Sequence, residues 1–300
     1  MRVALIGYGA VAAIHAAKLR TEPGVQLVSV FGPKGEKAAA FASKHGIPRA
    51  CGSIAEALLD ADAALICSPS TAHFKQACEC LEQGVHTLVE MPPCDNSAEA
   101  EELAILAGRR GVKLGCAHTS RFMRPYAEAK KSLALGRLGE VQEINYARYH
   151  KLPERSWTDN ALLHHSAHPI DLVFYWCGGL EPKACVALPD IHLPQAVSTL
   201  GRVPSGGAVT ITVSYVSRLF YTRVMIVGEK HTIETDGFSY AKSDLPDLAF
   251  SGHEQETYEE AIHVQDAEFL HACQGKGDFV SWDETLKVLH TIDNFRALGA

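Results

Sequence analysis

The sequence lacks the features that mark membrane and secreted proteins. No apolar run reaches the roughly 18 residues that a membrane-spanning helix needs. The opening MRVALIGYGA is too short and too rich in glycine for a signal peptide. The nine cysteines contain no CxxC pair, which favours reduced thiols over a disulfide framework. We therefore expect a cytoplasmic protein with no membrane partner.

A surplus of basic residues is also absent. The formal net charge is −7, whereas a protein that binds nucleic acid normally presents a basic stripe. We therefore expect no nucleic-acid partner. In an acidic chain, arginines that gather near candidate functional loops become more informative about an anionic small molecule.

The first part of the chain alternates short apolar runs with helical patterns. Its 300 residues exceed what one hydrophobic core usually organises, so two domains are expected. The strands, fully apolar rather than alternating, are expected at 2–7, 25–32, 63–69, 86–92 and 112–118. The helices are expected at 10–21, 36–46, 53–59, 72–84 and 97–111. This pattern predicts an α/β Rossmann domain over residues 1–120, a doubly wound parallel sheet covered on both faces.

The pattern changes beyond residue 120. A helix at 125–136 precedes an alternating strand at 139–151, and a second helix is expected at 164–179. Further strands, expected at 181–189, 208–217, 221–236 and 238–242, follow without helices between them, and two helices close the chain. Residues 121–300 are therefore predicted to form an α+β domain with a large mixed or antiparallel sheet.

The first loop carries a dinucleotide-binding pattern. GYGAVA fits G-x-G-x-x-A directly after a strand and at the start of a helix. Glycines permit a tight turn and a close approach to a pyrophosphate, and the helix N-terminus offers N–H donors. The residues expected to bind the cofactor here are Gly7, Gly9, Ala10, Val11 and Ala12. A purely structural glycine turn is the alternative.

The acidic residue that usually holds the ribose of NAD is missing from the end of the second strand. That position reads Phe31, Gly32, Pro33 and Lys34, with Lys37 one turn later. Two lysines without an acid favour NADP over NAD, although NAD stays possible. Both lysines are otherwise ordinary surface charges.

Two more loops follow the expected parallel strands, at the end of the sheet where ligands bind. CSPSTAH and EMPP supply further candidate cofactor contacts, with Met91–Pro92 as a candidate cis peptide. These contacts are Ser68, Pro69, His73, Glu90, Met91 and Pro92.

A histidine-rich segment, HHSAH, opens the expected helix at 164–179. His164, His168 and Asp171 are spaced by four and three residues, as in helical zinc sites. No glutamate follows the first histidine, so we expect no metal. Core or capping roles remain the plainest alternative, and His165 faces elsewhere on the helix.

Several of these motifs together resemble the Gfo/Idh/MocA oxidoreductases. They are GYGAVA, SPSTAH, a Glu-Met-Pro where the family has Glu-Lys-Pro, HTSRFMRP and a His-x-x-Asp at the start of a helix in the second domain. The resemblance implies an NAD(P)-binding Rossmann domain. It also implies a C-terminal sheet domain that contacts substrate and forms a homodimer or homotetramer.

By motif position, the resemblance makes His168 the residue beside the reacting carbinol and Asp171 its neighbour. Met91 replaces the family's lysine, and His164 stands where sugar-acting members commonly carry aspartate. Both departures argue against an ordinary polyol substrate. The segments VEMPP, HTSRF and RSWTDNALLHHSAHPIDL most resemble members that oxidise muconate semialdehydes, which also lack the lysine.

We therefore expect an NADP-dependent dehydrogenase that oxidises a cyclic hemiacetal bearing carboxylates to a pyrone lactone. His168 is the expected base because histidine titrates near neutral pH. Asp171, one helical turn on, is expected to orient His168 or to form a hydrogen bond nearby. Guanidinium groups bind carboxylates in bidentate geometry. The candidate substrate contacts are His118, Arg121, Arg124, Arg155, Trp157 and His165. A sugar or polyol dehydrogenase with an altered site, or a non-catalytic dinucleotide-binding regulator, is the alternative.

Overall fold

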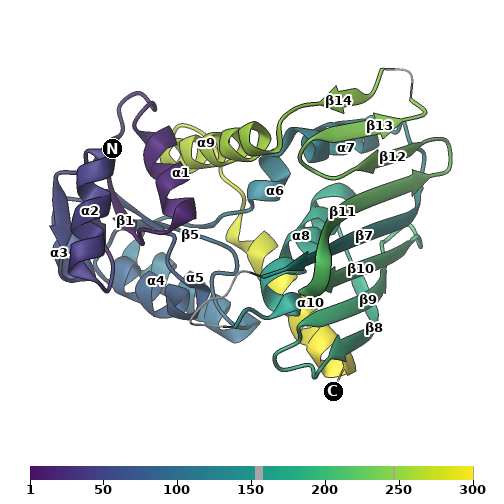
Figure 1. The fold of residues 1–300 in the computed structure, drawn as a ribbon, viewed down its shortest axis with the longest axis horizontal. Coiled ribbons are helices and arrows are strands. Elements are labelled where there is room, and N and C mark those ends of the chain that lie inside the picture. Colours follow the sequence, from purple (N-terminus) through teal and green to yellow (C-terminus); the bar gives the residue numbers. More distant parts are fainter. Residues whose placement is uncertain (153–157, 246, 300) are drawn as a thin grey trace. The chain divides into compact units, whose positions relative to one another are not determined.

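The computed structural model describes residues 1–152, 158–245 and 247–299, which divide into two compact units (Figure 1). The first unit comprises Met1–His118 and Ile262–Leu286. The second comprises Thr119–Ala261 and the chain from Lys287 onward. The first division lies close to the expected boundary at 120. The return of 262–286 to the first unit has no signal in the sequence.

The first unit is built on a six-stranded parallel sheet in the order β3-β2-β1-β4-β5-β6. Its strands are β1 (Arg2–Ile6), β2 (Gln26–Phe31), β3 (Arg49–Cys51), β4 (Ala63–Ile66), β5 (His86–Val89) and β6 (Leu114–Cys116). Its helical segments are α1 (Ala10–Leu19), α2 (Gly35–His45), α3 (Ile54–Leu58), η1 (Ser70–Ala72), α4 (His73–Glu82) and α5 (Ser97–Arg110). The predicted Rossmann fold is confirmed.

Backbone hydrogen bonds carry the parallel pairing one residue beyond the carboxyl ends of the central strands. The amide of Gly7 donates to the carbonyl of Phe31 at 2.8 Å, and that of Cys67 donates to Ile6 at 2.9 Å. The amide of Glu90 donates to Ile66 at 2.9 Å. The loops after β1, β4 and β5 therefore begin at one edge of the sheet, where the strand order reverses between β1 and β4.

The second unit contains an eight-stranded mixed sheet in the order β14-β13-β12-β11-β7-β10-β9-β8, in which only β7 and β10 run parallel among the described pairs. Its strands are β7 (Val141–Lys151), β8 (Glu181–Leu188), β9 (Ala196–Arg202), β10 (Ala208–Ser214), β11 (Val216–Gly228), β12 (Thr232–Thr235), β13 (Tyr240–Ser243) and β14 (Ala249–Ser251). This confirms the predicted mixed-sheet α+β domain.

The helical segments of the second unit cover one face of that sheet. They are α6 (Thr119–Phe122), α7 (Arg124–Ala134), η2 (Ala161–His165) and α8 (Ala167–Cys177). Tyr126 on α7 and Trp176 on α8 are buried and pack edge to face, with ring centroids 5.6 Å apart. Ile144 and Ile211 supply buried side chains from the sheet. Residues of the opposite face, including Ser198 and Leu200 on β9, are exposed.

Two long helices, α9 (Glu254–Cys273) and α10 (Trp282–Gly299), close the described chain as expected. Each contributes residues to both units. No helix within the described ranges is long and apolar enough to cross a membrane.

The helix expected at 164–179 is wrong at its start, because α8 begins at Ala167 after the wide turn of η2. The physical reason is Pro169, which lacks the N–H that would bond to the carbonyl of His165. The short β3, together with β9 and β14, also went unforeseen. Three residues are too few to show a period in β3.

Candidate active site

The candidate residues fall into two groups, one in each unit. In the first unit, the loop after β1 depends on glycine at Gly7, which adopts a φ of +129°. A Cβ there would lie 2.6 Å from the carbonyl carbon and oxygen of Cys67. The loop therefore packs directly against the loop after β4, which only glycine allows.

Gly9 differs from Gly7 because its missing side chain leaves open space. A Cβ at Gly9 would meet no atom within 4 Å. Gly9 is exposed and forms the N-cap of α1 without a side-chain hydrogen bond. The first turn, at Ala10, Val11 and Ala12, therefore presents N–H groups beside a bare backbone surface. This geometry fits the pyrophosphate of a dinucleotide.

The end of β2 carries an aromatic contact that the sequence analysis did not foresee. A Cβ at Gly32 would lie 2.0 Å from the ring of Tyr8, so the ring packs on the backbone of Gly32. The Tyr8 hydroxyl accepts a 3.3 Å hydrogen bond from the amide of Lys34. Lys34 and Lys37 are both exposed, and no described acidic residue occupies the end of this strand.

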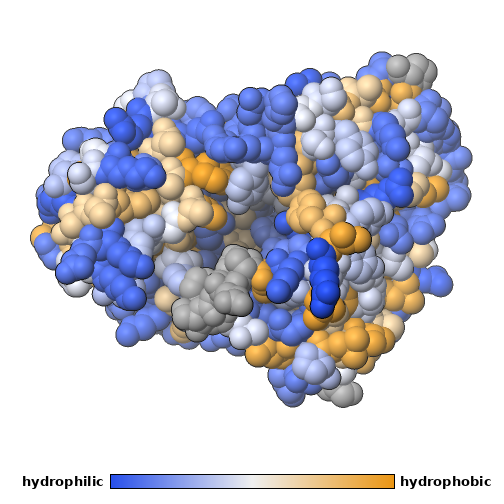
Figure 2. Space-filling view, viewed as in Figure 1, coloured by the Kyte–Doolittle hydropathy of each residue, from blue (hydrophilic) through white to orange (hydrophobic). Residues whose placement is uncertain are grey.

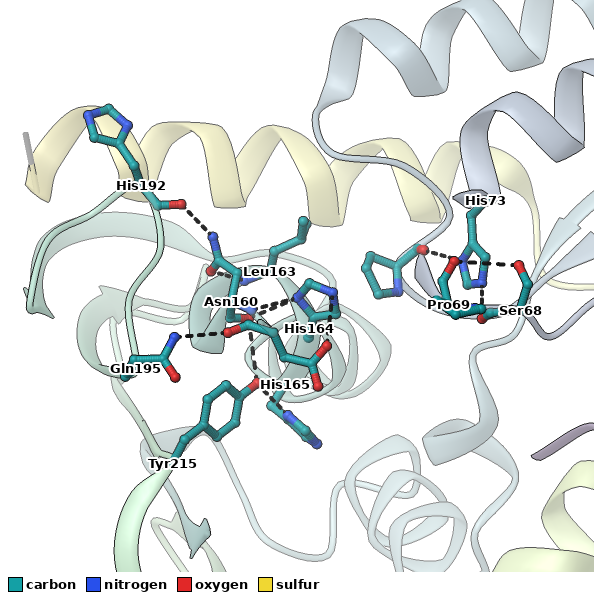
Figure 3. Close-up of polar contacts among 12 residues, drawn as sticks. Ser68, Pro69, His73, Asn160, Leu163, His164, His165, His192, Gln195 and Tyr215 are labelled. Carbon is teal, nitrogen blue, oxygen red and sulfur yellow. Dashed lines mark hydrogen bonds and ion pairs between the residues drawn. The ribbon is translucent and has the colours of Figure 1, made fainter. Parts of the chain in front are cut away.

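His73, a candidate cofactor contact, joins two of the sheet-edge loops (Figure 3). Its Nδ1 lies 2.8 Å from the carbonyl oxygen of Pro92, and its Nε2 lies 2.8 Å from that of Ser68. The ring is buried at the start of α4. Because Ser68 follows β4 and Pro92 follows β5, His73 holds these two loops together. Pro69, the residue after Ser68, is exposed.

Glu90 of the EMPP segment belongs to a buried ionic network. Its Oε1 lies 2.9 Å from Nε2 of His15 on α1, and the Nδ1 of His15 lies 2.6 Å from Oδ2 of Asp266 on α9. Burial lowers the pKa of His15, but the carboxylates of Asp266 and Glu90 outweigh it and raise the pKa to about 10. The predicted cis Met91–Pro92 bond is confirmed.

The second unit holds the histidines of HHSAH. The Nδ1 of His164 lies 3.0 Å from the amide nitrogen of Asn160 and 3.1 Å from its carbonyl oxygen, so the main chain of Asn160 fixes the position of the ring (Figure 3). The Nε2 of this ring lies 3.6 Å from Oδ1 of Asp159, which is buried. The side-chain oxygen of Asn160 in turn caps η2 by accepting from the amide of Leu163. His164 is thus an oriented histidine beside a carboxylate.

His165 lies beside Tyr215, the residue between β10 and β11, and points in a different direction from His164 (Figure 3). Its Nδ1 lies 2.5 Å from the hydroxyl oxygen of Tyr215. Burial, followed by the charges of Arg148, His168 and other nearby histidines, lowers the pKa of His165 well below its usual value. His165 is therefore a neutral residue near neutral pH. His168 is half-buried on the first turn of α8.

Asp171 is the ion-pair partner of Arg121. The Nε of Arg121 lies 3.0 Å from both carboxylate oxygens, and its Nη2 lies 2.6 Å from Oδ1. Asp171 is buried, and the side chain of Arg121 is nearly so. Arg121 and Asp171, predicted for substrate and catalysis, therefore neutralise one another.

The remaining predicted substrate contacts are dispersed. Arg124 is exposed at the start of α7, with its guanidinium 5.1 Å from the ring centroid of Phe250. His118 belongs to the first unit, where its Nε2 lies 2.9 Å from the hydroxyl of Thr285. Arg155 and Trp157 lie outside the described residues.

Within the described ranges, no three histidine, cysteine or acidic residues are arranged to hold a metal ion. Several residues of the two groups were not anticipated. Tyr8 fills a variable position of GYGAVA, and the other four belong to no recognised functional motif; all five are buried or half-buried, and the four are His15, Asp159, Tyr215 and Asp266. Only the adjacency of Asp159 and Asn160 to the histidine segment offered a signal.

A glycine-rich turn at the switch point of a parallel sheet, followed by a mixed-sheet unit bearing histidines, defines a two-unit nucleotide-dependent oxidoreductase. Residues 1–118 match the oxidoreductase family described as having an NAD-binding Rossmann fold, and residues 126–234 match the GFO/IDH/MocA C-terminal domain. The chain belongs to the Gfo/Idh/MocA oxidoreductase family. The predicted resemblance and the prediction of a dehydrogenase of this type are confirmed.

Similar proteins include 4-carboxy-2-hydroxymuconate-6-semialdehyde dehydrogenase of Sphingobium sp. (strain NBRC 103272 / SYK-6). It is 31% identical over 228 residues, which cover 72% of each chain. Trans-1,2-dihydrobenzene-1,2-diol dehydrogenase of Xenopus laevis is 28% identical over 239 residues, covering 76% of this chain and 72% of the relative. Among solved structures, GenD2 from gentamicin A biosynthesis in complex with NAD has a TM-score of 0.88 at 19% identity. That match covers 100% of this chain and 95% of the other, and it shows the fold.

Proposed function

We propose that the chain is an NADP-dependent dehydrogenase that oxidises a carboxylate-bearing cyclic hemiacetal to a lactone. A semialdehyde that closes on its own hydroxyl group already presents a secondary alcohol. Oxidation of that alcohol needs no thiol nucleophile. The similarity to the Sphingobium semialdehyde dehydrogenase supports this substrate class.

The nicotinamide of a bound dinucleotide supplies a hydride acceptor. Removal of the C–H electron pair as hydride and of the hydroxyl proton converts the hemiacetal carbon into the carbonyl of the lactone. We assign the proton to His168, half-buried at the start of α8. The rest of the protein's contribution is positioning.

The observation that carries the proposal is the paired change at Met91 and His164. Met91 provides no amine where the family motif has lysine. His164 provides an imidazole whose Nε2 faces Asp159 at 3.6 Å, where sugar-acting members commonly carry aspartate. Each change departs from the residue that the family or its sugar-acting members commonly carry at that motif position, so the two changes together argue against an ordinary polyol substrate.

We propose NADP as the preferred dinucleotide. Lys34 and Lys37 are exposed next to the end of β2, and Tyr8 holds the amide of Lys34. Lysine side chains there can pair with a 2′-phosphate, and no described acid at the end of the strand repels it. A cytoplasmic location stays a prediction, supported by nine free cysteines.

We also propose that copies of the chain assemble as a homodimer or homotetramer through the open face of the eight-stranded sheet. Large apolar side chains are exposed on this unit at Val186, Leu188 and Leu200. Figure 2 shows apolar surface over the region of β8 to β10. Exposed apolar patches of this kind mark association surfaces.

The direct test measures NADPH formation by absorbance with two substrate panels. One contains ring-cleavage semialdehydes, with and without extra carboxylates, and the other contains sugars and inositols. We expect turnover with the carboxylated semialdehydes only. His168→Asn should lower kcat by about two to four orders of magnitude while dinucleotide binding is retained. His253→Asn, at an exposed position before α9, is the matched control and should behave as wild type.

Each alternative has a distinct result. Turnover restricted to sugars would replace the proposed substrate with a polyol. Silence on both panels, with NADPH still bound in a fluorescence titration, would favour a dinucleotide-binding regulator. Near-normal turnover of His168→Asn would show that His168 is not the base.

A further inference from the structure

Arg148 lies on β7, on the face of that strand that also carries core residues of the second unit and His150. Side chains of β7 alternate between the two faces of the sheet, so Ile144, Tyr146, Arg148 and His150 share one face. Ile144 and Tyr146 are buried, whereas Arg148 and His150 are half-buried. The carboxyl-terminal half of β7 thus changes from packing residues to basic ones.

Two aromatic rings hold the guanidinium of Arg148. Its central carbon lies 5.7 Å from the ring centroid of Phe220 on β11 and 5.7 Å from that of Phe238. Phe220 is 60% exposed, so this stack lies at the surface of the unit. Stacking fixes the plane of the guanidinium and leaves its edge for hydrogen bonding.

Arg148 has no carboxylate partner among the residues that the structure describes. Its Nε is buried and makes no hydrogen bond there. This differs from Arg121, which Asp171 neutralises, and from Arg223, whose Nη2 lies 2.6 Å from Glu234. The guanidinium interacts with the hydroxyl of Tyr146 on the same strand face, but no described carboxylate neutralises its charge, which is a reason to look for an external anion.

Further basic groups lie beside Arg148. The rings of His150 and His165 meet edge to face with centroids 4.8 Å apart, and Tyr215 contacts both at 5.2 Å. The charge of Arg148 acts directly on His165, as does that of His168 on α8. Arg148 therefore belongs to the same cluster as the proposed base.

We propose that Arg148 anchors a carboxylate of the substrate and thereby sets the specificity for anionic substrates. This inference rests on the proposed function, and it assigns the anionic contact to Arg148 in place of Arg121. The guanidinium donates hydrogen bonds to the carboxylate oxygens, and Phe220 and Phe238 fix its orientation. His150 lies on the same face of β7 as Arg148 and supplies a second polar group for the substrate.

The test measures binding by calorimetry on the full-length, NADP-saturated protein, so it does not depend on turnover. The probes are pyridine-2,4-dicarboxylate and pyridine-2-carboxylate, which differ by one carboxylate. We expect wild type to prefer the dicarboxylate. Arg148→Gln should weaken dicarboxylate binding by roughly 10- to 100-fold and leave the monocarboxylate nearly unchanged.

Two further variants control for charge and folding. Arg110→Gln removes the same charge from an exposed position at the end of α5 and should keep the preference. Arg148→Lys keeps the charge but loses the planar fork, so an intermediate loss is expected. If circular dichroism shows that Arg148→Gln is unfolded, the lysine variant decides.

A dicarboxylate preference that survives in Arg148→Gln, or one that is absent from wild type, overturns the proposal. A lysine variant with wild-type preference does the same when the glutamine variant is unfolded. If the preference depends on Arg148 while the semialdehyde panel gives no NADPH, the anionic subsite stands and the proposed reaction fails.

Discussion

The imidazole Nε2 of His15 lies 2.9 Å from the carboxylate Oε1 of Glu90, although the two residues are 75 positions apart in the chain. Asp266 contacts the other nitrogen of the same ring at 2.6 Å. Helix α1, the EMPP turn and helix α9 therefore meet in one buried network. Glu90 follows β5 at the carboxyl end of the sheet, and its carboxylate pairs with the positively charged ring of His15.

The first prediction concerns the pH dependence of stability. The pKa of His15 is raised to about 10 in the folded chain and returns to about 6.5 on unfolding. The folded state therefore binds the proton more tightly, and the stabilisation is fully present below pH 6.5. It should decline as pH rises from 6.5 to 10. Urea unfolding of wild type and His15→Gln across this range measures the difference between them.

The comparison with His15→Gln cancels other groups that titrate in this range. We expect the stability advantage of wild type over the variant to be larger at pH 6 than at pH 10. An advantage that stays constant, or that grows with pH, would show that His15 is not held as a cation between the two carboxylates.

The second prediction separates two glycines of one motif. Gly7→Ala places a Cβ 2.6 Å from the backbone of Cys67 at a φ of +129°, so it should destabilise the fold by about 1–3 kcal/mol or more. Gly9→Ala meets no neighbour and should leave the free energy of unfolding nearly unchanged. Its methyl group should instead obstruct the pyrophosphate.

Urea unfolding without cofactor and a fluorescence titration with NADPH distinguish these effects. Gly9→Ala should bind NADPH at least several-fold more weakly at normal stability. Equal behaviour of the two variants in both measurements would contradict the separation of a packing glycine from a ligand-facing one.

Much of the fold follows from local patterns. The buried run of β1 after Arg2 and the whole of β4 are apolar because both faces of a parallel sheet are covered, and this signal is present in the sequence itself. The same holds for Gly46 and Gly111, which end α2 and α5 in the left-handed conformation. The assignment of 262–286 to the first unit depends on long-range packing, which no local period encodes.

The sequence predicts a site residue only where that residue belongs to a recognisable motif. His73 stands in a recognisable loop, but its role in joining Ser68 to Pro92 depends on both neighbours. Asp171 was expected to orient His168, whereas the structure pairs it with Arg121, 50 positions away. Ion pairs between distant segments leave no characteristic spacing in a single sequence, because the two partners meet only when the chain is folded.

The third prediction concerns the choice of dinucleotide. If Lys34 and Lys37 bind a 2′-phosphate, replacing both with glutamate should turn the attraction between these side chains and the phosphate into a repulsion. We expect the KM for NADP⁺ to rise roughly 10- to 100-fold, with a much smaller change for NAD⁺. Steady-state kinetics with each dinucleotide measures the ratio. Lys44→Glu, near the exposed C-terminal end of α2, makes the same kind of charge reversal once, away from the end of β2, and is the control. An unchanged ratio in the double variant would remove the lysines from cofactor selection.

The fourth prediction tests whether Arg121 is a structural residue. The Nε and Nη2 of Arg121 both contact the buried carboxylate of Asp171. Removing one partner of such a pair leaves an uncompensated charge, so Asp171→Ala and Arg121→Ala should each lower the free energy of unfolding by about 3–5 kcal/mol. The double variant should lose much less than the sum, because neither charge is then stranded. A double-mutant cycle by urea unfolding measures this coupling. Additive losses, or a stable Arg121→Ala that binds pyridine-2,4-dicarboxylate poorly, would return Arg121 to the substrate site and weaken the case for Arg148.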